Sequence, residues 1–360
     1  MKATHLVARL AARLLVGGLL GATLVGCVSG GGANNPDVDP GPILTNVGPN
    51  VITATYADLD QAVAELLSRV NALQADPTDA TLAAARSAWV DARSPWEASE
   101  GFLFGPADQL GLDPSLDTWP IDVVVIQRIL DGPDALTRDF VAAQDVDSGL
   151  RGFHVVEFLL FGDTGAKTAA DITAREFDYL VSAAQVLDED ASRLFTAWSP
   201  SGENFVAHVT GAGHVGSQFV SAKDALLTLS DALVGIADEV GTGKMQGPLD
   251  GGRMQVESRF SGNSKADFQN NIRSIRHIYE GTYAGTNGAG LTDMVGALDA
   301  ELDAQVKREI EGALTAIGAI PGDFREAITD HPAAVSMAID AVIDLKTTLE
   351  GVTARLSEAL

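Results

Sequence analysis

The feature that most constrains the fold is the spacing of apolar residues, which follows helical periodicity along almost the whole chain. Between residues 52 and 73, for example, five apolar residues fall on one helical face: Leu59, Val63, Leu66, Leu67 and Val70. No stretch shows the strict alternation of a half-buried strand. The pattern therefore predicts an all-α fold made of packed helical bundles, with further helices over 80–100, 120–131, 152–162, 171–198, 203–240, 265–281, 291–317 and 324–360.

The N-terminus is typical of an exported protein. Lys2, Arg9 and Arg13 precede a short apolar core, residues 14–26, which is too short for a permanent membrane span. The core ends in Leu-Val-Gly-Cys, which resembles a bacterial lipobox, so we expect Cys27 to carry lipid in the mature protein. The alternative is an ordinary signal peptide in which this cysteine is incidental.

Residues 28–50 are rich in Gly, Asn and Pro and predict a flexible tether between the lipid and the folded body. A second Gly-rich stretch, 241–252, predicts a linker between two domains. The sequence thus predicts an N-terminal helical bundle over 51–240 and a C-terminal helical bundle over 253–360, after a signal peptide and lipobox over 1–27.

The charge balance limits the partners that the chain can have. The net charge is −25, and removal of residues 1–26, with three basic and no acidic residues, makes it −28. So acidic a surface argues against nucleic acid and anionic lipid headgroups, whereas it concentrates cations. Cys27 is the only cysteine, so no internal disulfide can form and no thiol is left for catalysis.

One helical segment, Gly152–Gly162, places an imidazole and a carboxylate among apolar residues. His154 and Glu157 are three residues apart and share one helix face. Burying both is costly unless a metal, a substrate or a hydrogen-bonding neighbour satisfies them. The H-x-x-E pair alone is weak evidence, since a chain with six His and 49 acidic residues gives about one such match by chance.

Several standard chemistries have no counterpart in this sequence. It has no H-E-x-x-H zinc-peptidase string, no G-x-S-x-G elbow and no Walker loop. Bundle proteins that hold iron combine Glu-x-x-His pairs with further carboxylates from facing helices. Here the missing oxygens would come from Glu97 and Glu100, or from Asp117 and Asp122, and such mixed ligands suit iron, zinc or manganese.

Five segments resemble the imelysin-like family of exported bacterial proteins. The first three have the sequences RSPWEASEGFLFG, LDTWPID and GFHVVEFLLFG and begin at residues 93, 116 and 152. The last two are 257–264 and 267–281. The resemblance covers most of 51–360 and implies two packed helical bundles with a site at their junction.

The resemblance also implies a set of site residues and an envelope role in iron acquisition. Carried over by position, the site would use His154, Glu157, Glu100, Glu97 and Asp122 as metal ligands or their supports, and Arg259 to balance charge or hold an anion, with Trp96 and Trp119 as walls. We therefore expect a lipid-anchored protein, facing the periplasm or in the outer membrane, that binds iron, zinc or a small iron-containing ligand.

Two alternatives to this function stay open. One is a metal-dependent peptidase of the imelysin type, with Glu157 as base or ligand. The other is a non-catalytic module that presents its surface to an envelope transporter, in which case the acidic cluster would be purely structural.

Overall fold

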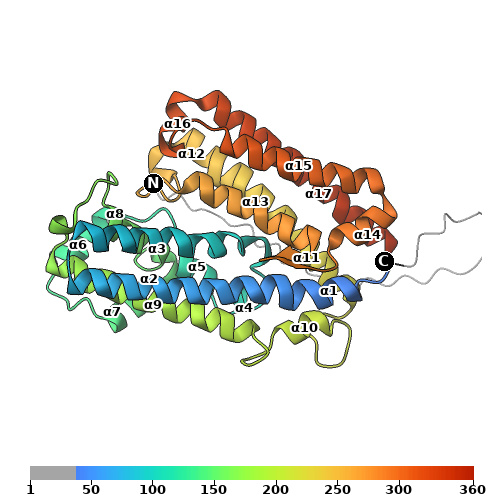
Figure 1. Ribbon diagram of the computed structural model, residues 1–360, viewed down its shortest axis with the longest axis horizontal. Coiled ribbons are helices and arrows are strands. Elements are labelled where there is room, and N and C mark those ends of the chain that lie inside the picture. The colour runs from blue at the N-terminus through green and yellow to red at the C-terminus, as the bar shows by residue number, and fades with distance from the viewer. Residues whose placement is uncertain (1–37) are drawn as a thin grey trace, which may run out of the picture. The chain divides into compact units, whose positions relative to one another are not determined.

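Two groups of long helices lie side by side in the computed structural model, which describes residues 38–360 (Figure 1). In the first group α2 packs against α3 and α9, and in the second α17 packs against α11 and α15. Helix α13 contacts both α15 and α3 and so joins the groups. These helices are α2 (Ala54–Ala75), α3 (Asp79–Glu97), α9 (Ala174–Trp198), α11 (Ala222–Asp238), α13 (Ser264–Glu280), α15 (Ala300–Gly318) and α17 (Pro332–Ala359).

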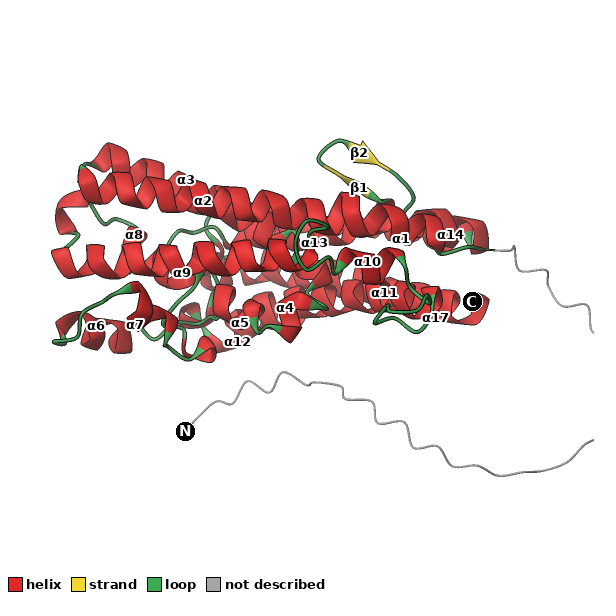
Figure 2. Cartoon of the chain, turned by 90° about the horizontal axis from the view of Figure 1, so that it is seen from below, coloured by secondary structure: helices red, strands yellow, loops and turns green. Residues whose placement is uncertain are grey.

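Shorter elements connect the long helices. The α-helices are α1 (Gly41–Val47), α4 (Pro106–Gln109), α5 (Leu112–Asp117), α6 (Val123–Asp131), α7 (Arg138–Ala142), α8 (Phe153–Phe161), α10 (Val206–Thr210), α12 (Gly247–Gly251), α14 (Leu291–Leu298) and α16 (Phe324–Asp330). Two π-helices, η1 (Gly48–Thr53) and η5 (Glu239–Gln246), and four 3-10 turns, η2 (Glu100–Phe102), η3 (Val146–Ser148), η4 (Ala169–Asp171) and η6 (Arg253–Gln255), complete the helical elements. The all-α prediction is confirmed. Among the described residues the only strands are β1 (Thr282–Tyr283) and β2 (Thr286–Asn287), which form the small hairpin in Figure 2.

The pairing of α2 with α3 follows from local sequence. The stripe predicted on α2 faces the core: Leu59, Val63, Leu66 and Val70 are each 0% exposed, and Leu67 is partly buried. Each such side chain contributes roughly 1.5–3 kcal/mol when it leaves water. Thr78 starts α3 as a capping box, because its hydroxyl accepts from the backbone N–H of Thr81. Sequence signals therefore fix where this hairpin turns and which faces meet.

The tether predicted over 28–50 is wrong for its last ten residues. Residues 41–50 lie in α1 and η1, and Ile43 and Val47 belong to the core. The side-chain amide of Asn46 donates to the carbonyls of Gly281 and Ala289, each at 2.9 Å, and ties α1 to the hairpin region. Composition misled here because glycine and proline stand at helix starts in this segment. Cys27 and the predicted signal peptide lie outside the described residues.

The Gly-rich stretch 241–252 is also not an unstructured linker. It forms most of η5 and all of α12, and Lys244 is 0% exposed. Helix α11, which the sequence places in the first bundle, packs against α13 and α17. The described residues, 38–360, fall within one compact unit, and the division into bundles over 51–240 and 253–360 stays a prediction.

Residues 108–119, which lie between the helices predicted over 80–100 and 120–131, contain α5, with Asp117 as its last residue. Gly111, in the left-handed region at φ 63°, allows the turn from α4 into α5. The peptide bond between Trp119 and Pro120 is cis. None of the helices within 38–360 is both long and apolar enough to cross a lipid bilayer.

Candidate metal site

Gly152 determines how closely α8 approaches α5. Its φ is 85°, and a Cβ added there would lie 2.4 Å from the carbonyl oxygen of Leu116. Only glycine accepts both this conformation and this contact. The first turn of α8 therefore lies against the end of α5, which places His154 beside Asp117.

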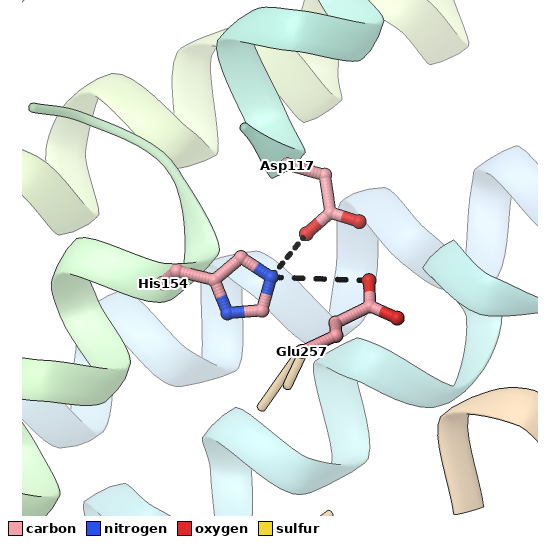
Figure 3. A group of neighbouring side chains, drawn as sticks. All are labelled: Asp117, His154 and Glu257. Atoms are coloured by element: carbon pink, nitrogen blue, oxygen red, sulfur yellow. Dashed lines mark ion pairs between the residues drawn. The ribbon is translucent and has the colours of Figure 1, made fainter. Parts of the chain in front are cut away.

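The imidazole of His154 lies between two carboxylates from distant parts of the chain (Figure 3). Its Nε2 is 3.2 Å from Oδ1 of Asp117 and 3.9 Å from Oε1 of Glu257. One ligand atom from each of the three residues falls within 4.8 Å of the others. Nε2 is buried and makes no hydrogen bond to any residue of 38–360, so the contact with Asp117 is electrostatic.

Glu157 holds the other side of the imidazole and is itself firmly anchored. Its Oε2 lies 2.9 Å from Nδ1 of His154. Its Oε1 accepts from the backbone N–H groups of Phe260 and Ser261, at 3.0 and 2.8 Å, and from the Ser261 hydroxyl at 2.8 Å. Because an ionised carboxylate only accepts, Nδ1 carries a hydrogen. Glu157 thus orients the ring, and Nε2 is the nitrogen that faces Asp117 and Glu257.

Arg93 is the main cation of the cluster. This fully buried guanidinium forms ion pairs with Asp117, Glu97, Glu257 and Asp267. It also lies 5.1 Å from the ring centroid of Phe153. Trp96 supports the same group, since its Nε1 donates to Oδ2 of Asp117 at 2.7 Å. Asp117 is therefore fixed on one carboxylate oxygen by Trp96 and on the other by Arg93.

A second cation, Lys244, comes from η5. Its Nζ lies 2.6 Å from Oε2 of Glu100, 3.1 Å from Oε1 of Glu257 and 3.4 Å from Oε2 of Glu97. Asn271 donates through Nδ2 to the same oxygens of Glu97 and Glu100, at 2.6 and 2.7 Å. Glu97 and Glu100 were predicted as metal ligands, and here their Oε2 atoms are bound by an ammonium and an amide.

Negative groups outnumber positive ones in this buried cluster. Within 38–360, six buried carboxylates meet here: Glu97, Glu100, Asp117, Glu157, Glu257 and Asp267. The positive groups are three permanent cations, Arg93, Lys244 and Arg259, and the imidazole of His154. This count includes Arg259, which lies at the edge of the cluster. Because uncompensated buried charge is costly, such a cluster takes up protons or a further cation.

The pKa values reflect this imbalance. Burial raises the pKa of Glu100 well above its usual range despite the opposing charge of Lys244, and burial raises that of Asp267 to about 6.

Burial alone would lower the pKa of His154, but the adjoining Asp117 and Glu157 carboxylates outweigh it and raise the value to about 9. For Asp117, burial would raise the pKa, yet Arg93 and His154 hold it below its usual range. A divalent cation at Nε2 would replace the imidazole proton.

Other predicted site residues lie around or outside this cluster. Asp122 is exposed and caps α6, because its carboxylate accepts from the N–H groups of Val124 and Val125. Arg259 and Trp119 line a cavity of about 10 Å³ next to His154 and Glu157. Arg259 donates to the carbonyl of Met254 at 2.8 Å, and burial lowers its pKa. The predicted wall role fits Trp119, whereas Trp96 holds Asp117.

Sequence reasoning gave no site role to four members of the cluster. Arg93, Glu257 and Asp267 lie in segments that resemble the imelysin-like family but stood out by no motif of their own. Lys244 lies in the stretch interpreted as a linker. The one available sequence signal was that Lys244 is an isolated cation among glycines. That signal does not indicate which residues Lys244 contacts.

The ligand types at His154, Asp117 and Glu257 fit a transition metal. One imidazole nitrogen with carboxylate oxygens suits iron, zinc or manganese. A metal-bound histidine commonly donates its other ring N–H to an anchored carboxylate, and Glu157 occupies that position. The fold and site together define an all-helical protein with a buried imidazole–carboxylate centre where α3, α5 and α8 meet the segment 244–271.

Comparison with known proteins identifies the family of the chain. Residues 52–349 match the model of peptidase family M75, imelysin, and the chain belongs to this family. "Iron-regulated protein A" of Synechococcus elongatus is 29% identical over 309 residues, covering 83% of this chain and 82% of that protein.

Two solved structures have the same fold. One is assigned as an iron-regulated protein A precursor from Parabacteroides distasonis; it has a TM-score of 0.81 and 26% identity, covering 88% of this chain and 95% of that one. An imelysin-like protein from Psychrobacter arcticum has a TM-score of 0.69 and 15% identity, covering 87% and 94%. The second likeness shows the fold alone.

Proposed function

We propose that the protein binds a metal ion, with iron as the leading candidate, through His154, Asp117 and Glu257. The observation that carries this proposal is the fixed orientation of His154. Anchored Glu157 holds Nδ1, so Nε2, which is buried and makes no hydrogen bond within 38–360, faces the carboxylates of Asp117 and Glu257. A bound cation would also offset the excess of buried negative charge.

Iron is favoured over zinc by the relatives, of which two carry the name iron-regulated protein A. The ligand types alone accept either metal. A bare ion is favoured over an iron-containing small molecule, because the cavity beside His154 measures about 10 Å³. That is about the room one water molecule needs.

Binding is favoured over peptidase chemistry by the contacts of Glu157. A general base needs an oxygen that can take a proton from water. Both oxygens of Glu157 are already bound, Oε2 beside Nδ1 of His154 and Oε1 by three donors. The family designation as a peptidase can be tested directly, since Glu157→Gln would abolish a chelator-sensitive proteolysis if that residue were the base.

Calorimetric titration of the mature protein with Fe²⁺ under anaerobic conditions, and with Zn²⁺, tests the proposal. We expect one ion per chain in the wild type and none in His154→Ala. Asp122→Asn is the matched control, because this predicted ligand is exposed and caps α6, so its loss leaves the site intact. Equal binding in wild type and His154→Ala, or loss of binding in the control, contradicts the proposal.

We further propose that the protein is held at the cell envelope by lipid on Cys27 and contributes to iron acquisition there, passing metal to an envelope transporter. The lipobox-like sequence before Cys27 and the names of the relatives support this. Mass spectrometry of the mature N-terminus and fractionation of Cys27→Ser test it. Release of that variant into the soluble periplasm is the expected result, and unchanged membrane association refutes lipid anchoring.

A further inference from the structure

A second carboxylate grouping adjoins the proposed metal site and shares a residue with it. Glu97, Glu100 and Asp117 each place an oxygen within 4.8 Å of the others, as Asp117, His154 and Glu257 do. Asp117 belongs to both groupings. Two groupings that share a carboxylate are the arrangement by which helical bundles hold two metal ions side by side.

The second grouping already contains a cation of the chain. Nζ of Lys244 lies 2.6 Å from Oε2 of Glu100 and 3.4 Å from Oε2 of Glu97. It is fully buried, so its charge is balanced only by the protein. The third contact, 3.1 Å to Oε1 of Glu257, reaches a carboxylate of the first grouping. Lys244 therefore lies where the two groupings adjoin.

Asn271 binds the same two carboxylates of the second grouping as Lys244. Its Nδ2 donates to the same two Oε2 atoms, at 2.6 Å to Glu97 and 2.7 Å to Glu100. The remaining oxygen of Glu97 forms an ion pair with Arg93. A metal in the second grouping would have to displace two donors from each Oε2 atom. The first grouping differs in one ligand: Nε2 of His154 has no hydrogen bond within 38–360 to give up, although Oδ1 of Asp117 and Oε1 of Glu257 are paired with Arg93 and Lys244.

We propose that the ammonium group of Lys244 is a built-in cation that fills the second grouping, so that the centre takes one metal ion and not two. Lys244 thereby sets the metal stoichiometry. This inference rests on the proposed metal-binding function for the first ion, but the occupation of the second grouping by Lys244 does not depend on it. Replacing the ammonium by an apolar group of similar length would open the second grouping to a metal.

The test counts Zn²⁺ per chain, by elemental analysis and calorimetric titration, in the full mature protein and in Lys244→Met produced with Zn²⁺ in the medium. We expect one ion in the wild type and two in Lys244→Met. The second ion should be lost in Lys244→Met/Glu100→Gln and retained in Lys244→Met/His154→Ala. Lys307→Met is the matched control, because it removes an ammonium from a half-exposed pair with Asp303 and should leave one ion.

The outcomes separate this inference from the proposed function. No ion in the wild type, with one ion in Lys244→Met that survives His154→Ala, supports the role of Lys244 and refutes the first site. One ion in both proteins, two in the wild type, or none in either overturns the role of Lys244. So does a Lys244→Met protein that fails to fold with Zn²⁺ present, because a metal would then be unable to replace the ammonium.

Discussion

The carboxylate of Glu157 lies 2.9 Å from Nδ1 of His154 and turns the opposite ring nitrogen toward Asp117. The two residues come from one turn of α8, yet they contact different parts of the protein. His154 faces the carboxylates of other segments, whereas Glu157 is bound to the backbone of residues 260 and 261. The H-x-x-E pair is thus one candidate ligand and its support, and not two ligands.

Glu157→Gln should weaken metal binding without removing the ligand. The amide keeps the shape of the side chain but is a poorer acceptor for Nδ1–H, so the ring loses orientation and basicity. Loss of such a supporting partner lowers metal affinity by about 10–100-fold. Zn²⁺ titration checks this, and an effect as complete as that of His154→Ala would show instead that Glu157 is itself a ligand.

The metal-free protein should lose stability between about pH 6.5 and pH 9. The pKa of His154 is about 9 in the folded chain and about 6.5 when unfolded, so the folded state binds more protons in that range. The contribution is complete below pH 6.5 and disappears as the pH rises through 9. Urea unfolding across this range, in the presence of a chelator, should show a decline that His154→Gln lacks; parallel curves would contradict the raised pKa.

Gly152→Ala should cost far more stability than Gly111→Ala. Both residues have positive φ, but a Cβ at 152 would meet the backbone of Leu116 at 2.4 Å, whereas one at 111 meets nothing within 4 Å. Conformational strain alone costs about 1–2 kcal/mol, which is the loss expected at 111. At position 152 the new Cβ would also push α8 away from α5, which increases the loss of stability and should abolish metal binding. Thermal unfolding of both variants checks it, and equal losses would contradict the close contact.

Arg93→Gln should be among the most destabilising single changes. It leaves four buried carboxylates, Asp117, Glu97, Glu257 and Asp267, without their shared cation. Breaking a buried pair costs about 3–5 kcal/mol. The control is Arg69→Gln, which removes an exposed pair with Glu65 and should change the unfolding free energy by less than about 1 kcal/mol. Similar denaturation midpoints for both variants would count against the network.

Asn46→Ala tests whether residues 41–50 belong to the folded body. The amide of Asn46 bonds two carbonyls more than 230 residues away, and its loss leaves both without that donor. We expect a loss of about 1–3 kcal/mol. Asn50→Ala is the matched control, since Asn50 donates only to the Asn46 side chain. An unchanged melting temperature for Asn46→Ala would instead support the prediction that residues 41–50 belong to the tether.

Much of the helical framework is visible in the sequence because helix formation and helix faces are local properties. The apolar stripe of α2, the cap at Thr78 and the glycine before His154 each follow from residues a few positions apart. Local composition was misleading where glycine and proline occur inside or at the start of helices, as in 41–50 and 241–252.

Which charges meet at the site was decided by tertiary structure alone. Lys244 contacts Glu97 and Glu100 from about 145 positions away, and Glu257 reaches His154 from the turn before α13. No sequence period links such residues, since their pairing depends on how α13 packs against both α3 and η5. The sequence by itself determined most of the long helices and the His154–Glu157 pair. Packing decided that Asp117 and Glu257 complete the candidate site and that Glu97 and Glu100 pair with Lys244.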